Sequence, residues 1–388
     1  MTATFEVAAI VEDALLAAAR RRLPAEVLGG AALTAAVVDR SRRYTSERER
    51  LAAPGGERAS IADLAARALF FTVADAAKLH LPLAELASGA LPAPPGFLAG
   101  PEVRVLDVGA GCGAMTLGLC TFLARSAARP RLVVTLVDRD GDALAIAADA
   151  IGAVARALGL EVAVTVRAGD VNAALPAGPY DLVVAGSVLN ELAAPTTVTE
   201  AMIAALAPAG VAIIVEPALR TTTRALHAVR DALVTAGCAA VLAPCSRRAA
   251  PCPALADDRD WCHDHRPLTL PPRARQLAHV TGLRDGDLKL AYLTLCRPAA
   301  APPPSQAWRV VSDPHASKGK LELTLCGAPG WVPARLLKRN RSAANRAVER
   351  ARRGDLLVIE PTPTVDSPDL EASTTAVIAA TSPHTFPG

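Results

Sequence analysis

Three glycines interrupt the chain directly after a short apolar run, in the sequence Val103-Arg-Val-Leu-Asp-Val-Gly-Ala-Gly-Cys-Gly-Ala114. Glycine at such a turn lets the backbone come close to a ligand, and the helix that follows offers unpaired N–H groups at its start. This order of strand, glycine turn and helix predicts a nucleotide-type ligand against Gly109 and Gly111. Asp107, at the end of the predicted strand, lies beside the same turn.

Two more acidic residues, Asp138 and Asp170, follow the next two predicted strands. Asp138 can accept hydrogen bonds from ribose hydroxyls, and Asp170 can accept one from an adenine amine. A nicotinamide site would place its acid about twenty residues past the glycines and keep a third glycine. Here Asp138 lies 29 residues past Gly109, and Ala114 takes the third glycine position. A Rossmann-like sheet that has lost its ligand is the alternative.

The pattern of glycines and acids resembles the S-adenosylmethionine-binding fold of class I methyltransferases. This resemblance implies that S-adenosylmethionine is the cofactor. The residues it implies for cofactor binding are Asp107, Gly109, Gly111, Asp138 and Asp170.

The sequence leaves catalysis open, and whether the chain is an enzyme is uncertain. Ser187, Asn190 and Glu191 follow the fourth predicted strand, where a base for methyl transfer would lie. Glu191 fits an acid at a helix start better than a base. No Asn-Pro-Pro-Tyr segment is present, and Cys112 and Cys120 are expected to pack in the core rather than act as nucleophiles.

Three cysteines, Cys245, Cys252 and Cys262, lie in a proline-flanked loop with the spacing C-x6-C-x9-C. This spacing is wide for a zinc knuckle and suits an iron–sulfur cluster, whose thiolates converge from several loops. A fourth ligand is required. Cys238 and Cys296 adjoin predicted strands and fit a core, whereas Cys326 precedes a Gly-Ala-Pro-Gly turn and is expected to be exposed. Zinc remains the alternative metal.

Around these cysteines the chain resembles the mitochondrial small-ribosomal-subunit assembly methyltransferase-like family and its bacterial relatives, over roughly residues 30–360. The segments that carry the resemblance are the Asp107–Gly111 loop, Leu189–Leu192, Ile214–Pro217, Pro244-Cys245, Cys252-Pro253, Trp261–His263, Lys318–Lys320 and Leu325–Gly327. It implies a 4Fe-4S cluster held by Cys245, Cys252, Cys262 and Cys326, and association with the small ribosomal subunit. Two segments depart from the family pattern, Ser246-Arg247 and Phe71–Asp75. We expect Trp261 to shield the cluster and His263 to support it or lie on the surface.

The elements that must position these residues alternate as strand and helix from Val103 to Glu216. The alternation predicts an α/β fold with a doubly wound, largely parallel, Rossmann-like sheet. Two further strands, Ala239–Ala243 and Leu288–Leu295, are predicted around the cysteine loop. The expected parts are an N-terminal helical region (1–98), a methyltransferase-like domain (99–298) with the cysteine-rich loop 244–265, a small β-rich basic unit (305–360) and a mobile tail (361–388).

Charge is unevenly distributed along the 388 residues, although the net charge is only +3. Residues 241–388 hold 20 of the 41 Lys and Arg but 14 of the 38 Asp and Glu. Eight of these basic residues lie between Arg335 and Arg353, where a helix from Ala343 to Arg352 would place Arg346, Arg350 and Arg353 on one side. This pattern favours RNA binding through phosphates over a solvated face. The arginines at 20–22 and 40–43 are expected to be solvated helix ends.

Composition excludes two classes of protein. The longest apolar runs, such as Val211–Val215, are far shorter than the roughly 20 residues that span a bilayer, and the first ten residues do not form a secretory signal. We therefore expect a cytoplasmic protein with reduced cysteines, no membrane partner and no sign of an obligate oligomer. The predicted function is small-subunit assembly or translation by a protein that binds ribosomal RNA. The alternative is an active methyltransferase on RNA or a small molecule with a structural metal.

Overall fold

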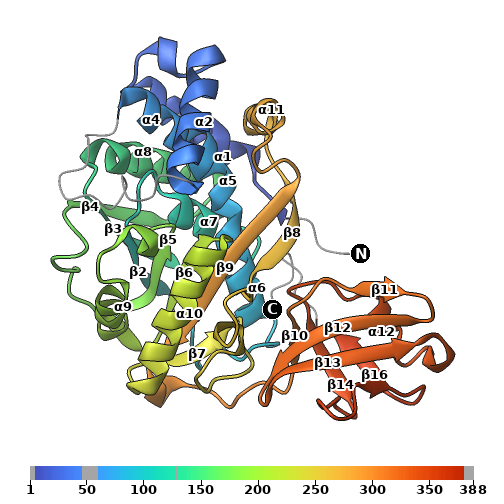
Figure 1. The fold of residues 1–388 in the computed structure, drawn as a ribbon. Helices are drawn as coiled ribbons and strands as arrows, with labels where there is room; N and C mark the ends of the chain where they lie inside the picture. Colours follow the sequence, from blue (N-terminus) through green and yellow to red (C-terminus); the bar gives the residue numbers. More distant parts are fainter. Residues whose placement is uncertain (1–4, 46–59, 127–128, 380–388) are drawn as a thin grey trace.

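The computed structural model describes residues 5–45, 60–126 and 129–379. In this part of the chain two sheets are present: a nine-stranded sheet formed by residues up to Cys296, and a seven-stranded sheet that begins at Trp308. Figure 1 shows the second sheet, in orange and red, packed beside one end of the larger domain. The two sheets are thus formed by separate segments of the chain.

The large sheet has the strand order β1-β8-β9-β6-β5-β2-β3-β4, and β7 pairs with β9. Five neighbouring strands from β4 to β6 run parallel, whereas β9 is antiparallel to its neighbours β6, β7 and β8. The strands are β1 (Phe5–Glu6), β2 (Glu102–Val108), β3 (Arg131–Asp138), β4 (Val162–Ala168), β5 (Tyr180–Gly186), β6 (Leu206–Pro217), β7 (Ala240–Ala243), β8 (Asp264–Thr269) and β9 (Asp287–Cys296). This order confirms the doubly wound, largely parallel sheet, in which β9 runs in the reverse direction.

Successive residues of the central strands pack into different apolar clusters, because strand side chains alternate between the two faces. In β5, Leu182 and Val184 belong to the cluster on one face, and Val183 and Ala185 to the cluster on the other. Helices α9 and α10 cover the second face. The helices are α1 (Ala9–Arg20), α2 (Gly30–Thr45), α4 (Ile61–Ala66), α5 (Thr72–Ala76), α6 (His80–Ala87), α7 (Ala114–Leu123), α8 (Gly141–Leu158), α9 (Pro195–Ala204), α10 (Arg220–Thr235), α11 (Pro272–Thr281) and α12 (Arg346–Arg350). Of these described helices, none is long and apolar enough to cross a membrane.

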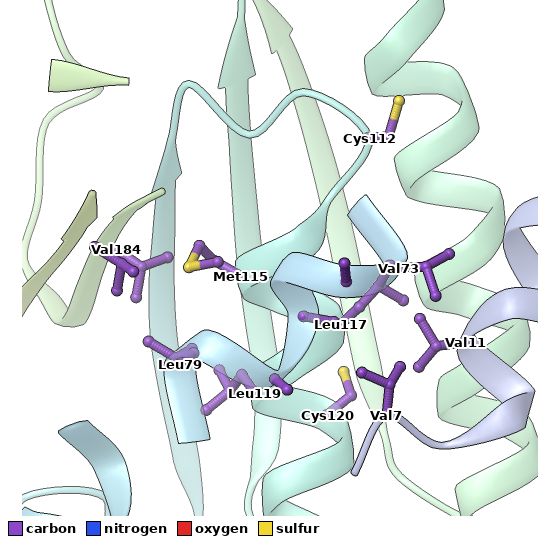
Figure 2. Close-up of a cluster of buried hydrophobic side chains, with 14 of the residues drawn as sticks. Val7, Val11, Val73, Leu79, Cys112, Met115, Leu117, Leu119, Cys120 and Val184 are labelled. Atoms are coloured by element: carbon purple, nitrogen blue, oxygen red, sulfur yellow. The ribbon is translucent and has the colours of Figure 1, made fainter. Parts of the chain in front are cut away.

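Cys112 and Cys120 lie in the core around α7, as predicted. Their side chains are 3% and 0% exposed, and Figure 2 shows them among the apolar side chains that surround this helix. A close approach of α5 explains Gly118 in α7: a Cβ there would lie 2.2 Å from the Ala76 carbonyl oxygen. Neither cysteine is placed to act as an exposed nucleophile.

The N-terminal region is helical, and its long predicted helix from Ile61 to Leu86 is a continuous helical stretch with irregular turns. The Ser60 hydroxyl caps its start by accepting from the Asp63 N–H at 3.1 Å. A π-helical turn (Arg67–Phe71) and a 3₁₀ turn (Ala77–Leu79) separate α4, α5 and α6. These turns change the direction in which Arg67 and Lys78 project, which sequence periodicity does not reveal.

The small sheet has the order β15-β13-β12-β10-β14-β16, with β11 beside β12. Its strands are β10 (Trp308–Val310), β11 (His315–Ser317), β12 (Lys320–Gly327), β13 (Gly330–Leu337), β14 (Leu356–Glu360), β15 (Asp369–Leu370) and β16 (Thr375–Ile378). The last two strands lie in the expected mobile tail, where Leu370 is 1% exposed and β16 pairs with β14. Residues 361–379 are therefore part of the unit, and residues 380–388 lie outside the described chain.

Two segments differ from prediction because polar side chains are buried in them. The predicted basic helix from Ala343 to Arg352 is shortened to α12, since the fully buried Asn345 accepts from the Ser342 N–H and donates to the Asn340 carbonyl. Strand β8 and helix α11 occupy the predicted loop before β9. Charged residues in β8 conceal it in the sequence, yet Asp264 and Arg266 pair with each other and are each 3% exposed.

Candidate functional site

The glycine turn after β2 is open at one position and closed at another. Gly109 and Gly111 have φ values of 64° and 50°, in the left-handed region that glycine adopts without strain. A Cβ at Gly109 would lie 2.3 Å from Cγ2 of Val188, whereas no atom of the residues that the structure describes lies within 4 Å of a Cβ position at Gly111. Space for a ligand therefore lies over Gly111.

Asp138, at the end of β3, is tied to this turn. Its Oδ2 accepts from the Gly111 N–H at 2.8 Å, and its Oδ1 accepts from the Asp140 N–H at 2.9 Å. The Asp138 carbonyl also accepts from the Gly169 N–H at 2.9 Å, which brings Asp170 to the same edge of the sheet. Asp170 is exposed and accepts from the Asn172 N–H and side-chain amide, which lower its pKa.

Asp107 lies beneath the turn and is 1% exposed. Its Oδ2 accepts from the Thr116 hydroxyl at 2.7 Å and from the Thr116 N–H at 3.2 Å. Burial raises the pKa of this carboxyl to about 7, even though these hydrogen bonds favour the charged form. Within the described chain both bonds go to Oδ2, so Oδ1 can accept from a ligand.

The turn after β5 is fastened to β6 by Glu216. This buried carboxylate accepts from the Leu189 N–H at 2.9 Å and from the Asn190 side-chain amide at 2.6 Å. Burial raises the pKa of Glu216 to about 7. Ser187, which begins the turn, has a φ of 59°, an uncommon conformation for a residue with a Cβ.

Four cysteines, from the loop after β7 and from β12, lie near enough to one another that the charge of one shifts the pKa of another. Cys245 follows β7, Cys252 and Cys262 follow in the same loop, and Cys326 lies in β12 of the small sheet. Burial raises the pKa of the Cys262 thiol well above its usual value, and the negative charges that Cys245, Cys326 and Cys252 would carry raise it further. Burial likewise raises the pKa of Cys252 to about 11 and of Cys326 to about 12, with Cys245 adding to both.

Of the other cysteine predictions, one is confirmed and two are wrong. Cys296 ends β9 and is 0% exposed, as expected, but Cys238 is exposed rather than part of the core. Cys326 is 8% exposed, so the prediction of an exposed position was wrong: it lies inside a strand that extends to Gly327, beneath the cysteine loop. Trp261 stacks on His263 with ring centroids 3.9 Å apart. Across the described residues, no group of three or more His, Cys, Asp or Glu side chains is arranged so that it could hold a metal ion.

Residues 95–358, more than half of the chain, match the family model described as mitochondrial small ribosomal subunit Rsm22. The chain belongs to the Rsm22 family. No curated protein sequence matches it significantly. The predicted resemblance is therefore confirmed at the level of the family, while its iron–sulfur site remains a prediction.

The solved structures that resemble this Rsm22-family chain include several methyltransferases and a cyclase, SpnF. Magnesium protoporphyrin IX methyltransferase from Synechocystis PCC 6803 is 14% identical, with 68% of this chain and 96% of that chain covered and a TM-score of 0.34. The plantazolicin methyltransferase BpumL is 13% identical, with 74% and 96% covered and a TM-score of 0.33. An S-adenosylmethionine-dependent methyltransferase from Mesorhizobium loti is 23% identical, with 34% and 54% covered and a TM-score of 0.24. The methyltransferase-like fold follows from the strand order of the large sheet.

This Rsm22-family chain has two arginines near the site, Arg40 and Arg67, that were not predicted from the sequence. Arg40, expected at a solvated helix end, is 9% exposed and lies 3.5 Å from the Asp63 carboxylate and 3.8 Å from Glu191. Arg67 contacts both Asp63 and Asp140. These ion pairs hold α2 and α4 against the edge of the sheet that carries the glycine turn. No sequence signal links Asp63 to these arginines beyond its helical spacing from Arg67.

Glu191, the candidate base, faces two arginines, Arg40 and Arg139. Burial raises its pKa, and the guanidinium groups of Arg40 and Arg139 oppose that rise. Arg139 lies 4.0 Å away and Arg40 3.8 Å away. Two arginines thus face the Glu191 carboxylate, but burial outweighs their charges and its pKa stays raised. Among the described residues, Glu191 therefore remains a candidate base at the end of β5.

Proposed function

We propose that this chain is an S-adenosylmethionine-binding iron–sulfur protein that binds small-subunit ribosomal RNA and assists assembly of the subunit or translation. Membership of the Rsm22 family is the observation that carries the ribosomal part of the proposal. The two sites described above supply its chemistry. The experiment for the ribosomal part is sedimentation of the tagged chain with ribosomal subunits, in which it should travel with the small subunit.

The glycine turn supports cofactor binding. The open position over Gly111 admits a ligand, and each oxygen of Asp138 keeps a second lone pair for a ribose hydroxyl after accepting its backbone N–H. Asp170 lies on the surface at the same edge, and we assign to it the hydrogen bond from the adenine amine. In this role the chain binds and orients the cofactor, and Asp107 Oδ1 accepts from its amino group.

The convergence of four thiols supports an iron–sulfur cluster. The residues Cys245, Cys252, Cys262 and Cys326 provide the four-thiolate donor set that such clusters use, and all of them are free cysteines. Because burial raises the pKa of the Cys252, Cys262 and Cys326 thiols, cluster binding must release protons from these three residues. It must also rearrange the side chains, since the described residues do not form a metal-binding group here. When bound, the cluster supplies iron–thiolate bonds between the loop and β12. Zinc in place of iron would leave the donors unchanged but give no visible absorbance.

The basic segment supports RNA binding with a smaller set of residues than expected. Arg335 pairs with Asp369, Arg341 with Glu349, and Arg353 with Asp313, so these arginines also hold the small unit together. The exposed members that form no such ion pair in the described chain are Lys338, Arg339, Arg346, Arg350 and Arg352. We assign phosphate contacts to these five residues.

The second candidate is an active methyltransferase that acts on RNA or a small molecule. The observation in its favour is the accessible glycine turn, beside which a methyl donor would lie. Against it, Glu191 and Glu216 are both engaged in structural contacts. Mass spectrometry of ribosomal RNA from a deletion strain separates the two: a missing methyl group supports the enzyme, and an unchanged methylation pattern supports the assembly role.

A further inference from the structure

We infer that Arg309 is a positioning residue of the four-cysteine site, which holds the Cys245 end of the loop against the strand that carries Cys326. The inference rests on the proposed cluster and concerns how the chain shapes its ligand set. It begins from the position of Arg309 in β10, directly opposite Cys326 in the antiparallel pairing with β12. Side chains directly opposite each other in an antiparallel pair lie on the same face of a sheet.

From this position the Arg309 guanidinium reaches into the other domain. Its Nε and Nη2 both donate to the Pro244 carbonyl, at 2.9 and 2.8 Å. Pro244 immediately precedes Cys245, so one side chain connects the backbone beside one candidate ligand with the strand of another. Ser246, which follows Cys245, adds a weaker contact: its hydroxyl donates to the Cys326 carbonyl at 3.3 Å.

Three further hydrogen bonds fix the orientation of the Arg309 guanidinium. Nη1 donates to Oε1 of Glu85 at 2.6 Å, Nη2 donates to Oε2 at 2.9 Å, and Nη1 also donates to the Gly354 carbonyl at 2.6 Å. Arg309 is 3% exposed and Glu85 is 0% exposed, so water does not compete for these bonds. Simultaneous bonding to the Glu85 carboxylate and the Pro244 carbonyl requires the planar guanidinium with its five donors, because a lysine ammonium cannot hold both groups in one plane.

Two other arginines, the half-buried Arg224 and the buried Arg230, hold the middle of the loop but not its junction with β12. Arg224 donates to the carbonyls of Ala254, Asp257 and Asp260 at 2.7–2.8 Å, and Arg230 donates to those of Arg247 and Ala249 at 2.8 and 3.0 Å. Both project from α10 of the large domain. Within the described chain, Arg309 is therefore the arginine that spans from β10 to the first cysteine of the loop.

A matched control lies in the same interface. Arg266 is also 3% exposed and also joins the two units, through Asp355 at 2.8 Å, while pairing with Asp264 of its own strand at 3.0 Å. Its side-chain hydrogen bonds in the described chain go to Arg353 and Asp355 rather than to residues 244–262. Arg266→Lys should thus weaken docking of the small unit without releasing Pro244.

The experiment compares iron retention in full-length protein purified anaerobically, using the parent, Arg309→Lys and Arg266→Lys. The readouts are iron per chain and the rate at which a ferrous chelator removes iron. Arg309→Lys should lose iron at least tenfold faster than the parent, and Arg266→Lys within twofold of the parent. Equal rates for Arg309→Lys and the parent, or equally fast loss from both variants, would overturn the positioning role.

The proposed cluster has its own outcome in this experiment. A parent protein without iron refutes the cluster, and with it the role of Arg309 in positioning ligands. If Arg309→Lys does not fold, Glu85→Gln takes its place, because it loosens the guanidinium while leaving Arg309 present. Faster iron loss from Glu85→Gln supports the inference, and a rate equal to that of the parent overturns it. Gel filtration and circular dichroism establish that each variant is folded.

Discussion

The N–H of Gly111 and the carboxylate of Asp138 are hydrogen-bonded at 2.8 Å, although 27 residues separate them. This bond joins the turn after β2 to the end of β3, so the two predicted parts of the cofactor site form one unit before a ligand arrives. Such preorganisation reduces the ordering cost of binding. It also makes Asp138 responsible for the shape of the turn as well as for contact with a ribose.

Asp138→Ala should weaken binding of S-adenosylmethionine by about 1–3 kcal/mol, because a partly buried hydrogen-bond partner is lost. Gly111→Arg should abolish binding, since it fills the open space and places a side chain at a φ of 50°. Isothermal titration calorimetry measures both. Asp149→Ala, in α8, where the carboxylate pairs with Arg21 and Arg22 rather than with the turn, is the control and should bind as the parent does. Unchanged affinity in both test variants would remove the cofactor from this turn.

The raised pKa of Asp107 predicts how stability depends on pH. Its pKa is about 7 in the folded chain against 3.8 for the free side chain, so between about pH 4 and 7 the folded state holds the extra proton. The free energy of unfolding therefore falls as pH rises through this range. Asp107→Asn keeps an oxygen for Thr116 but removes the titration. Its stability relative to the parent should rise by about 1–3 kcal/mol from pH 4 to pH 7.

Urea unfolding at several pH values tests this prediction. Glu216 contributes in the same direction in both proteins, because its pKa is also raised to about 7, so the comparison isolates Asp107. Parallel curves of stability against pH for parent and variant would show that Asp107 is not the titrating group.

Replacing candidate cluster ligands should separate Cys326 from Cys296. Cys326→Ser should eliminate the brown chromophore, make the C-terminal unit accessible to protease and prevent small-subunit association. Cys296→Ser should retain iron near the level of the parent, because this thiol lies at the end of β9 and its one electrostatic partner is Arg248 rather than another cysteine. Iron analysis and visible absorbance are the measurements. The opposite pattern of retention would reassign the fourth ligand, and zinc in both proteins would refute the iron–sulfur cluster.

Reversing two exposed arginines should weaken RNA binding. Arg346→Glu with Arg350→Glu leaves the ion pairs of Arg335 and Arg353 in place, so the small unit should remain folded. The slope of log affinity against log salt should become shallower by about 1.5–2, as expected when two phosphate contacts are lost. Filter binding to small-subunit RNA measures this. Arg156→Glu with Arg275→Glu makes the same charge change on exposed helices elsewhere, and an equal effect there would indicate attraction by net charge alone.

The central sheet could be predicted because its signals are local. The strands β2, β3, β5 and β6 each contain a short apolar run, and the glycine turn directly follows one of them. The doubly wound, largely parallel class of the sheet followed from the strand–helix alternation. Strand β8 escaped prediction because its buried Arg266 and Asp264 have the composition of a loop, and only their mutual pairing makes burial possible.

Long-range pairing also explains what was missed in the site. Arg40 looks like an ordinary surface arginine until Asp63, 23 residues later, is placed beside it. The convergence of Cys326 with the loop cysteines was implied by family resemblance, but its burial was not, because the cover over β12 comes from a segment 80 residues earlier in the chain. The strands β15 and β16 are short, and partners in β13 and β14 define them.

The buried pair of Glu85 and Arg309 has a consequence for biosynthesis, because 224 residues separate its members. A ribosome that adds roughly 5–20 residues per second needs about 11–45 s to make that length. During this interval the N-terminal helices can collapse, but α6 carries a carboxylate whose cationic partner does not yet exist. The native arrangement of the first helical region must therefore await the last third of the chain, and a nascent chain truncated before β10 should remain a substrate for chaperones.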